Sequence, residues 1–288
     1  MIAPARLHID DGDGLLSIEA MAVLRPLIAA SGSPLSEYSL ANLYLYRHRH
    51  HYRFVDAPVP HVRGVTYDGE PHVLPLAPLD AMTVDELLVD SACLAPLGSE
   101  APALARRLDL ACGWNEDDSD YVYDAARLGQ LTGAKAKRAQ ARAFEESMAP
   151  ALVAITADNL AQADAVLDGW FEDVGRGAAD TDLDECREAL ALREALDLEG
   201  RLVLARGAPV AFLLAGPGAD GSRIVHFAKG RRAFAGAYPW MFAAYAREVG
   251  EGRINFEQDL GKPGFAQAKR AFAPAAKLHK YRLRRRET

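Results

Sequence analysis

The sequence predicts an α+β protein of two domains, from its length, its composition and the alternation of helical and strand patterns. The chain has 288 residues, near the upper limit for one hydrophobic core and suited to two domains of roughly 140 residues each. Half of the residues are hydrophobic and 25% are charged, which is typical of a globular protein and excludes a disordered one. Helical apolar spacing and short apolar runs occur in both halves.

The first half begins with a helix and continues with short strands. Helical apolar spacing predicts helices over residues 17–30, 83–90, 102–112 and 134–148. Short runs bounded by Pro and Asp-Gly turns predict strands over residues 52–55, 62–67 and 72–76. The acidic segment 114–123 ends in a strand-like stretch, 121–123, ahead of the long basic helix.

Turn residues separate the elements of the second half clearly. An amphipathic helix is predicted over 182–196 and ends at Gly200. A Gly-Ala-Pro turn joins two apolar runs, which predicts a hairpin of strands 201–206 and 209–215. The remaining predictions are a strand 222–228, a loop 229–237, a helix 238–249, a strand 253–256, a helix 264–272 and a closing strand 278–283.

Charge is unevenly distributed along the chain. The net charge is -7, yet residues 262–288 hold nine Lys or Arg and a single acid. A second basic patch contains Lys135, Lys137, Arg138 and Arg142. Such patches can meet a phosphate, a nucleic acid or an anionic cofactor, and the alternative is a solvated helix face. Overall acidity argues against a dedicated binder of duplex DNA.

Cysteine and histidine usage predicts neither a disulfide framework nor a metal site. Cys93, Cys112 and Cys186 are odd in number and lack metal-ligand spacing, which indicates a reducing compartment. His48, His50 and His51 form a cluster without a carboxylate or cysteine at metal spacing, so a solvated loop is the better interpretation. No serine-hydrolase or nucleotide-binding glycine motif is present.

No targeting or membrane segment is predicted. Residues 1–16 carry Asp10, Asp11 and Asp13 where a signal peptide would have a basic and then an apolar region. No stretch approaches the ~18 consecutive apolar residues of a membrane span. We therefore expect a cytoplasmic protein.

The order of elements in the second half resembles the core of the N-acetyltransferase-like (GNAT) superfamily. In that superfamily the loop after the third strand cradles a pyrophosphate on backbone N–H groups at a helix start. Here that loop contains Lys229, Arg231 and Arg232, which suit an anion. The superfamily's signature is not matched, because Tyr238 occupies its final Gly or Ala position and Arg232 lies one residue too early. The motif therefore does not support a coenzyme A site.

A second resemblance rests on several motifs in a fixed order. The main motif is Asn-Phe-Glu-Gln-Asp-Leu-Gly over residues 255–261, followed by Gly264-Phe265 and Ala268-Lys269-Arg270. The other matching residues are Ser36, Glu37, Tyr44, Tyr46, Trp114, Asp117, 121–123, Leu131, Gly133, Lys137, Arg138, 224–227, Lys229, Gly236 and Tyr238. Over residues 36–281 the chain resembles the phosphatidylglycerol lysyltransferase C-terminal-domain family. It departs from the family pattern at Ala139, Ala228 and Phe256, where a polar group is usual.

The resemblance implies two tandem GNAT-like domains, 1–134 and 135–288, each a mixed, mostly antiparallel sheet flanked by helices. It also implies an acyl-transfer site in the C-terminal domain. Lipid-modifying relatives resemble enzymes that move an aminoacyl group from aminoacyl-tRNA onto a lipid, with membrane helices ahead of this domain.

Acyl transfer needs a base for the acceptor and donors for the oxyanion. Glu257 or Asp259 is the predicted base, provided that burial raises its pKa toward neutrality; the two would face one way if the strand continued that far. Lys269 is predicted to hold a phosphate or the acyl carbonyl, and Tyr281 to protonate a leaving group. The alternatives are a helix cap for Asp259, a structural ion pair for Lys269 and a core position for Tyr281.

The leading hypothesis is an acyltransferase that moves an aminoacyl group from aminoacyl-tRNA to an amine or hydroxyl of a lipid or small molecule, without a metal or bound cofactor. An acyl-CoA-dependent N-acyltransferase and a catalytically silent binding module are the alternatives. The expected partners are tRNA and the acceptor, and not DNA; the oligomeric state is left open. The predicted substrate-binding residues are Trp114, Tyr121, Lys137, Arg138, Lys229, Arg231, Arg232, Tyr238 and Asn255.

Overall fold

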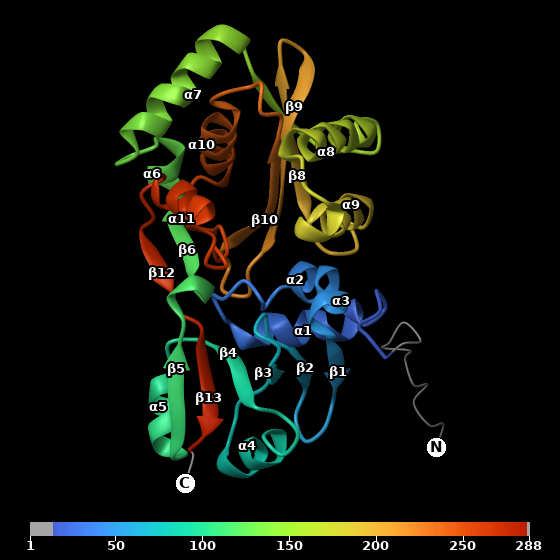
Figure 1. Ribbon diagram of the computed structural model, residues 1–288, viewed down its shortest axis with the longest axis vertical. Coiled ribbons are helices and arrows are strands. Elements are labelled where there is room, and N and C mark those ends of the chain that lie inside the picture. The colour runs from blue at the N-terminus through green and yellow to red at the C-terminus, as the bar shows by residue number, and fades with distance from the viewer. Residues whose placement is uncertain (1–13, 287–288) are drawn as a thin grey trace. The chain divides into compact units, whose positions relative to one another are not determined.

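A computed structural model describes residues 14–286 of the chain (Figure 1). These residues form two compact units. The first unit runs to Ser119 and also contains Gly218–Asp220 and the segment from Leu278 onward. The second unit contains Asp120–Pro217 and Gly221–Lys277. Asp10, Asp11 and Asp13 lie outside the described residues. The expectation that this region contains no signal sequence therefore concerns residues that the structure does not describe.

The first unit is built on a six-stranded mixed sheet. In spatial order its strands are β1 (Arg53–Val55), β2 (His61–Val65), β3 (Pro71–Pro75), β4 (Cys93–Leu97), β13 (Tyr281–Arg285) and β5 (Leu110–Trp114). Strands β1 to β3 form an antiparallel meander, β3 and β4 are parallel, and β13 is antiparallel to both of its neighbours.

Short helices accompany this sheet. They are α1 (Met21–Ser31), α2 (Leu40–Leu45), α3 (Arg47–His50), α4 (Ala81–Leu87), α5 (Ala101–Arg107) and the 3-10 turn η1 (Glu116–Asp118). Side-chain caps begin three of them, because Ser39 accepts the Asn42 N–H, Asp80 accepts the Thr83 N–H and Asn115 accepts the Asp117 N–H. Apolar residues of α4 and α5 pack on Val73, Leu94 and Leu283 of the sheet, which are fully buried.

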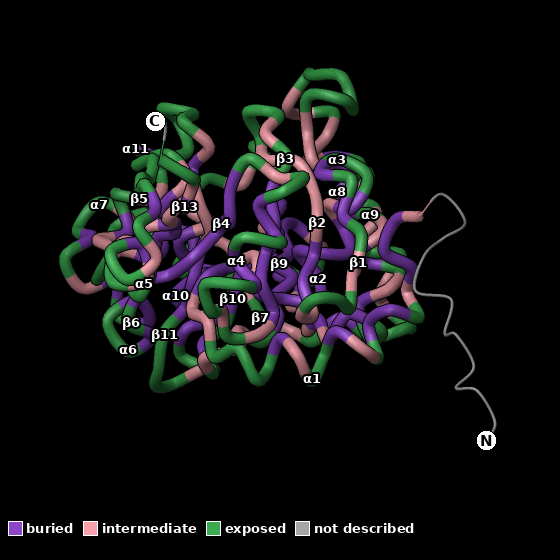
Figure 2. Tube along the Cα trace, turned by 90° about the horizontal axis from the view of Figure 1, so that it is seen from below, coloured by how far each residue is buried: buried purple, intermediate pink, exposed green. Residues whose placement is uncertain are grey.

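The second unit is built on a seven-stranded mixed sheet. In spatial order its strands are β12 (Ala276–Leu278), β6 (Asp120–Asp124), β11 (Arg253–Asn255), β10 (Arg223–Gly230), β9 (Ala208–Pro217), β8 (Glu199–Ala205) and β7 (Ala151–Ala154). The pairs from β7 to β10 are antiparallel, β10 and β11 are parallel, and β11 and β6 are antiparallel. The mainly apolar β9 is buried along most of its length (Figure 2).

Helices cover both faces of this sheet (Figure 1). They are α6 (Ala125–Gly129), α7 (Lys135–Met148), α8 (Leu160–Val174), α9 (Leu183–Ala191), α10 (Ala237–Val249), α11 (Pro263–Arg270) and the 3-10 turn η2 (Ala178–Asp180). Helix α10 packs between α6, α7 and one face of the strands, and α8 packs with α9 on β9 and β10. Gly236 has φ +90°, and a Cβ there would lie 2.4 Å from the Gln140 carbonyl oxygen, so the start of α10 needs glycine.

Both units follow one strand pattern: an antiparallel meander, one parallel pair, then a strand taken from the other half of the chain. That strand is β13 in the first sheet and β6 in the second. The α+β class and the tandem GNAT-like architecture are thus confirmed. The expected boundary between residues 134 and 135 falls inside the second unit, between α6 and α7.

Several element predictions are confirmed and others are wrong. The hairpin of β8 and β9, strand β10 and helix α10 lie where the turns placed them. The helix expected over 102–112 ends at Arg107, because Asp109 adopts φ +52° and the chain turns into β5. The closing strand 278–283 is two strands, β12 and β13, in different sheets. Strand β7 and helix α8 were not predicted.

Among residues 14–286, no helix combines the length and the apolar character that crossing a membrane requires.

Acid should destabilise the first unit through His72 in β3. Its ring is buried, Nδ1 donates to the Ala95 carbonyl oxygen at 2.8 Å, and burial lowers the pKa of His72 to about 4. Between pH about 6.5 and 4 the unfolded chain binds a proton that the folded ring does not, so stability falls with pH by roughly 3 kcal/mol. Unfolding by urea at pH 7 and pH 4 measures this. His72→Gln should reduce the pH dependence, and His48→Gln, at an exposed position, should not; equal slopes in all three proteins would contradict the assignment.

Candidate active site

The second unit contains a break in its sheet beside the parallel pair. Only Arg223 and Ile224 of β10 pair with β11, which ends at Asn255, while β10 continues to Gly230. The register between β10 and β9 shifts between Val225 and Phe227, which places His226 in a β-bulge. Bulges redirect side chains and are frequent next to active sites.

His226 and Glu257 connect the two strands at this break. His226 Nδ1 lies 2.8 Å from Glu257 Oε1, so the ring is protonated at Nδ1 and donates to the carboxylate. The His226 side chain is 1% exposed and the Glu257 side chain 15% exposed. His226 Nε2 is buried without a hydrogen-bond partner, and a Cβ on Gly216 would lie 3.3 Å from it. The imidazole therefore fixes one carboxylate oxygen of Glu257.

The turn after β11 is held by Asn255. Its Oδ1 accepts the Glu257 N–H at 2.7 Å, and its Nδ2 donates to Asp120 Oδ2 of β6 at 2.9 Å. Glu257 has φ +57°, a conformation that is uncommon for a residue with a side chain. Because the strand ends at Asn255, the alternation that would have turned Glu257 and Asp259 the same way does not reach them.

Lys269 of α11 clamps the same turn. Its ammonium donates to the carbonyl oxygens of Phe256 at 2.6 Å, Glu257 at 3.1 Å and Gln258 at 2.5 Å. Three successive carbonyls bound to one cation compensate for the backbone conformation at Glu257. Lys269 thus contacts the backbone that carries the predicted base.

Asp259 is buried and both of its carboxylate oxygens accept hydrogen bonds. Tyr121 donates its hydroxyl to Oδ2 at 2.7 Å, and the Gly261 N–H donates to Oδ1 at 3.0 Å. Burial, and then Asp259, raise the pKa of Tyr121. The Lys277 ammonium lies 4.5 Å from the centre of the Tyr121 ring. The pair Tyr121–Asp259 therefore ties β6 to the turn.

Two of the three charges expected in loop 229–237 are paired within the unit, and Lys229 lies in β10, which continues to Gly230. Lys229 is buried, binds Asp182 Oδ1 at 2.5 Å and lies 3.9 Å from the centre of the Trp170 ring. Asp173 of α8 accepts from Arg231 Nε at 2.9 Å and from the Arg232 backbone N–H at 2.8 Å. The ring of Tyr238 lies against Gly230, and burial raises its pKa.

The residues of the two basic patches have different surroundings in the structure. On α7, Arg138 is exposed and Lys137 lies over the Phe272 ring at 5.2 Å. In the C-terminal stretch, Lys280, Arg282 and Arg284 form ion pairs in the first unit. Their partners are Glu37 for Lys280, Asp68, Glu70 and Asp118 for Arg282, and Glu70 for Arg284.

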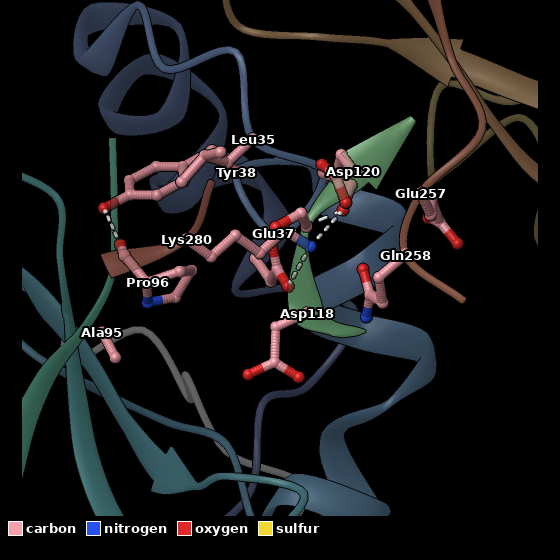
Figure 3. Close-up of polar contacts among 12 residues, drawn as sticks. Leu35, Glu37, Tyr38, Ala95, Pro96, Asp118, Asp120, Glu257, Gln258 and Lys280 are labelled. Carbon is pink, nitrogen blue, oxygen red and sulfur yellow. Dashed lines mark hydrogen bonds and ion pairs between the residues drawn. The ribbon is translucent and has the colours of Figure 1, made fainter. Parts of the chain in front are cut away.

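The remaining predicted site residues, Trp114 and Tyr281, belong to the first unit. They pair across β5 and β13, and Trp114 stacks on His279 with ring centres 3.8 Å apart. Close to β13, Lys280 donates to Glu37 Oε1 at 2.7 Å and to the Ser36 hydroxyl at 3.1 Å (Figure 3). The Tyr38 hydroxyl donates to the Pro96 carbonyl oxygen in the same view. The Ser-Glu pair of the sequence motif thus binds a buried lysine.

Within residues 14–286, no three or more His, Cys, Asp or Glu side chains gather in a way that could hold a metal ion. His50 of the histidine cluster is buried, and its Nδ1 donates to the Val65 carbonyl oxygen at 2.7 Å. Its ring stacks on Tyr52, with ring centres 5.1 Å apart, and burial lowers the pKa of His50.

Sequence analysis did not place His226, Asp120 or Asp182 in the site. A histidine in an apolar strand was the available signal for His226, but a bulge cannot be recognised from residue identity. Asp120 and Asp182 meet their partners across 135 and 47 residues of chain, a separation that local patterns do not report.

Comparison with known proteins agrees with the fold and the resemblance. The family described as "Phosphatidylglycerol lysyltransferase, C-terminal" matches residues 29–284. No curated protein sequence matches the chain. A conserved protein of unknown function from Bacteroides thetaiotaomicron VPI-5482 has a similar structure, with a TM-score of 0.81 and 22% identity over 94% of this chain and 98% of that one.

Two further solved structures share the fold. L-PGS from Bacillus licheniformis has a TM-score of 0.60 and 16% identity, covering 93% of this chain and 92% of that one. The C-terminal domain of a putative lysylphosphatidylglycerol synthetase from Agrobacterium fabrum has a TM-score of 0.62 and 12% identity, covering 94% and 93%.

Fold and family together place this chain among the acyltransferases. It belongs to the phosphatidylglycerol lysyltransferase C-terminal family, whose match covers most of its length.

Removal of the Lys269 ammonium should destabilise the second unit. Lys269→Met removes the ammonium from three carbonyls, one of which, that of Glu257, still accepts the Tyr121 N–H. The cost is on the order of 3 kcal/mol in the free energy of unfolding, since hydrogen bonds to charged groups contribute about 1.5–3 kcal/mol. Urea unfolding followed by circular dichroism measures it. Lys262→Met, at an exposed position next to the same helix, is the control and should change stability by less than about 0.5 kcal/mol. Equal stabilities for both variants would show that the clamp is not needed.

Proposed function

We propose that the second unit transfers an aminoacyl group from aminoacyl-tRNA to an amine or hydroxyl acceptor on a lipid or small molecule, with Glu257 as general base. The observation that carries this proposal is the Glu257 carboxylate beside the break between β10 and β11. One of its oxygens is held by the buried His226, and its backbone by Lys269. A carboxylate oriented by several neighbours in a strained turn is typical of a reacting group.

Geometry favours Glu257 over Asp259 as the base. Both oxygens of Asp259 accept hydrogen bonds from Tyr121 and Gly261, and the residue is 3% exposed. Glu257 is more exposed, and His226 Nδ1 engages only its Oε1. A base must reach the proton that it removes, so Asp259 serves as a support for the turn.

The reaction follows from these positions. Glu257 removes the proton from the acceptor amine or hydroxyl as that atom attacks the ester carbonyl carbon of the aminoacyl group. The bond from this carbon to the terminal ribose oxygen of the tRNA breaks, and the ribose oxygen takes up a proton. The products are the aminoacylated acceptor and free tRNA. No cofactor is needed for this exchange of one acyl bond for another.

The donor is inferred from charge. The segment 134–144 of α7 has no acid, which suits a polyanion. By contrast, loop 229–237, where an acyl-CoA pyrophosphate would bind by analogy, has Lys229 and Arg231 paired with Asp182 and Asp173. This pairing favours tRNA over acyl-CoA as the donor.

Glu257→Gln should abolish turnover and leave the fold intact. Loss of a general base lowers the rate by roughly 10²- to 10⁴-fold. Lysyl-tRNA with phosphatidylglycerol vesicles is the first substrate pair to test, and thermal melting checks folding. Asp259→Asn should instead lower stability, by about 1–3 kcal/mol, because it disturbs the hydrogen bond from Tyr121. Near-normal turnover of Glu257→Gln with a substrate that the parent uses would remove Glu257 from this role.

Lys137→Glu with Arg138→Glu should weaken tRNA binding. Each lost phosphate contact reduces the slope of log affinity against log salt by about one, so the double reversal flattens this dependence as well as lowering affinity. Fluorescence anisotropy with labelled tRNA at several salt concentrations measures both. The control is Arg176→Glu with Arg187→Glu, an equal charge change away from α7. If acyl-CoA protects the parent from thermal unfolding and tRNA does not, acyl-CoA would be the donor.

A further inference from the structure

Helix α11 lies on the surface of the second unit with little of it buried. Ala266 is the one buried residue of the helix. Pro263, Gly264, Phe265 and Ala268 are exposed, and Phe265 is 52% exposed. Among the described residues of this unit, Phe265 is the only large hydrophobic side chain exposed to this extent. The Phe265 ring is therefore accessible to a partner outside the unit's own core.

A lysine lies beside this ring, and an arginine ends the helix. The Lys262 ammonium lies 5.4 Å from the centre of the Phe265 ring, and Arg270 is exposed at the end of the helix. From Gly261 to Arg286 the sequence contains no Asp or Glu. The exposed residues of α11 are therefore apolar or basic, apart from Gln267, and include no acid.

The neighbouring basic helix has a different character. Helix α7 lies close by, because Lys137 contacts Phe272 and a Cβ on Gly133 would lie 3.2 Å from the Ala273 Cβ. Its exposed residues include Lys135, Arg138 and Gln140, which suit a polyanion in water. Apolar and basic residues together, as on α11, suit the boundary between lipid headgroups and acyl chains.

We propose that residues 261–276, centred on α11, bind the surface of an anionic membrane, with Phe265 inserted among the lipids and Lys262 and Arg270 on the headgroups. The proposal rests on the proposed function in one respect: membrane contact would bring a lipid acceptor to the second unit. Binding itself requires no turnover, so it can fail or succeed independently of the chemistry.

The test is sedimentation of the full chain with vesicles of phosphatidylcholine alone and of phosphatidylcholine with 30% phosphatidylglycerol. We expect binding to the anionic vesicles, weakening as salt is raised. Phe265→Ser should lower this binding by about tenfold, through the lost apolar insertion. Lys262→Glu with Arg270→Glu should lower it by more than about tenfold, since each basic residue near such a surface is worth about fivefold.

Two controls separate this surface from others. Met82→Ser changes a side chain that is 70% exposed on α4 beside Asp85 and Glu86, and should leave vesicle binding unchanged. Lys137→Glu with Arg138→Glu should weaken tRNA binding more than vesicle binding. Thermal melting confirms that each variant is folded.

Three results would overturn the proposal. The first is that the parent does not bind anionic vesicles, and the second is that the parent and both α11 variants bind them equally. The third is that the α11 substitutions weaken tRNA binding and leave vesicle binding unchanged. The last result would assign the α11 surface to RNA. Vesicle binding that depends on α11, in a protein without lysyl transfer, would support the surface and count only against the proposed function.

Discussion

The completion of each sheet by a strand from the other half of the chain is the constraint on which the rest of this structure depends. Strand β6 lies between β11 and β12, and β13 between β4 and β5. Each is an inner strand, so its backbone donors and acceptors pair on both sides. Neither sheet can be assembled from one contiguous half. A division of the chain at residue 134 would separate β6 from the sheet that it completes.

The candidate active site depends on the same exchange. Backbone pairing extends past β11, because the Phe256 N–H donates to the Tyr121 carbonyl and the Tyr121 N–H to the Glu257 carbonyl. The side chains of Asp120 and Tyr121 then bind Asn255 and Asp259. Strand β6 thereby supports the turn from one side, and Lys269 supports it from α11. The unusual backbone of Glu257 is stable because several neighbours determine it.

The structure shows which basic residues of the sequence have acidic partners and which are exposed. The basic C-terminal stretch is one feature in sequence, yet its last third forms ion pairs in the first unit, whereas Lys262 and Arg270 stay exposed in the second. Lys229 and Arg231, which looked like anion ligands, have acidic partners from α8 and the start of α9. In the second unit, the two basic patches of the sequence therefore present exposed Lys and Arg side chains on α7 and beside α11.

Sequence alone determined the α+β class, the hairpin of β8 and β9, helix α10 and the family, because these depend on local periodicity, turn residues and motif order. It also selected Glu257, Asp259 and Lys269 through one contiguous motif. Only the tertiary structure decided that both oxygens of Asp259 accept hydrogen bonds and that His226 lies in a β-bulge. It also decided that residues 120–124 and 281–285 each pair with strands from the other half of the chain. The Tyr121–Asp259 hydrogen bond and the pairing of β6 and β13 join residues far apart in the chain, and the bulge depends on the register between β9 and β10. Hydrogen bonding between separate segments leaves no periodic trace in a single sequence.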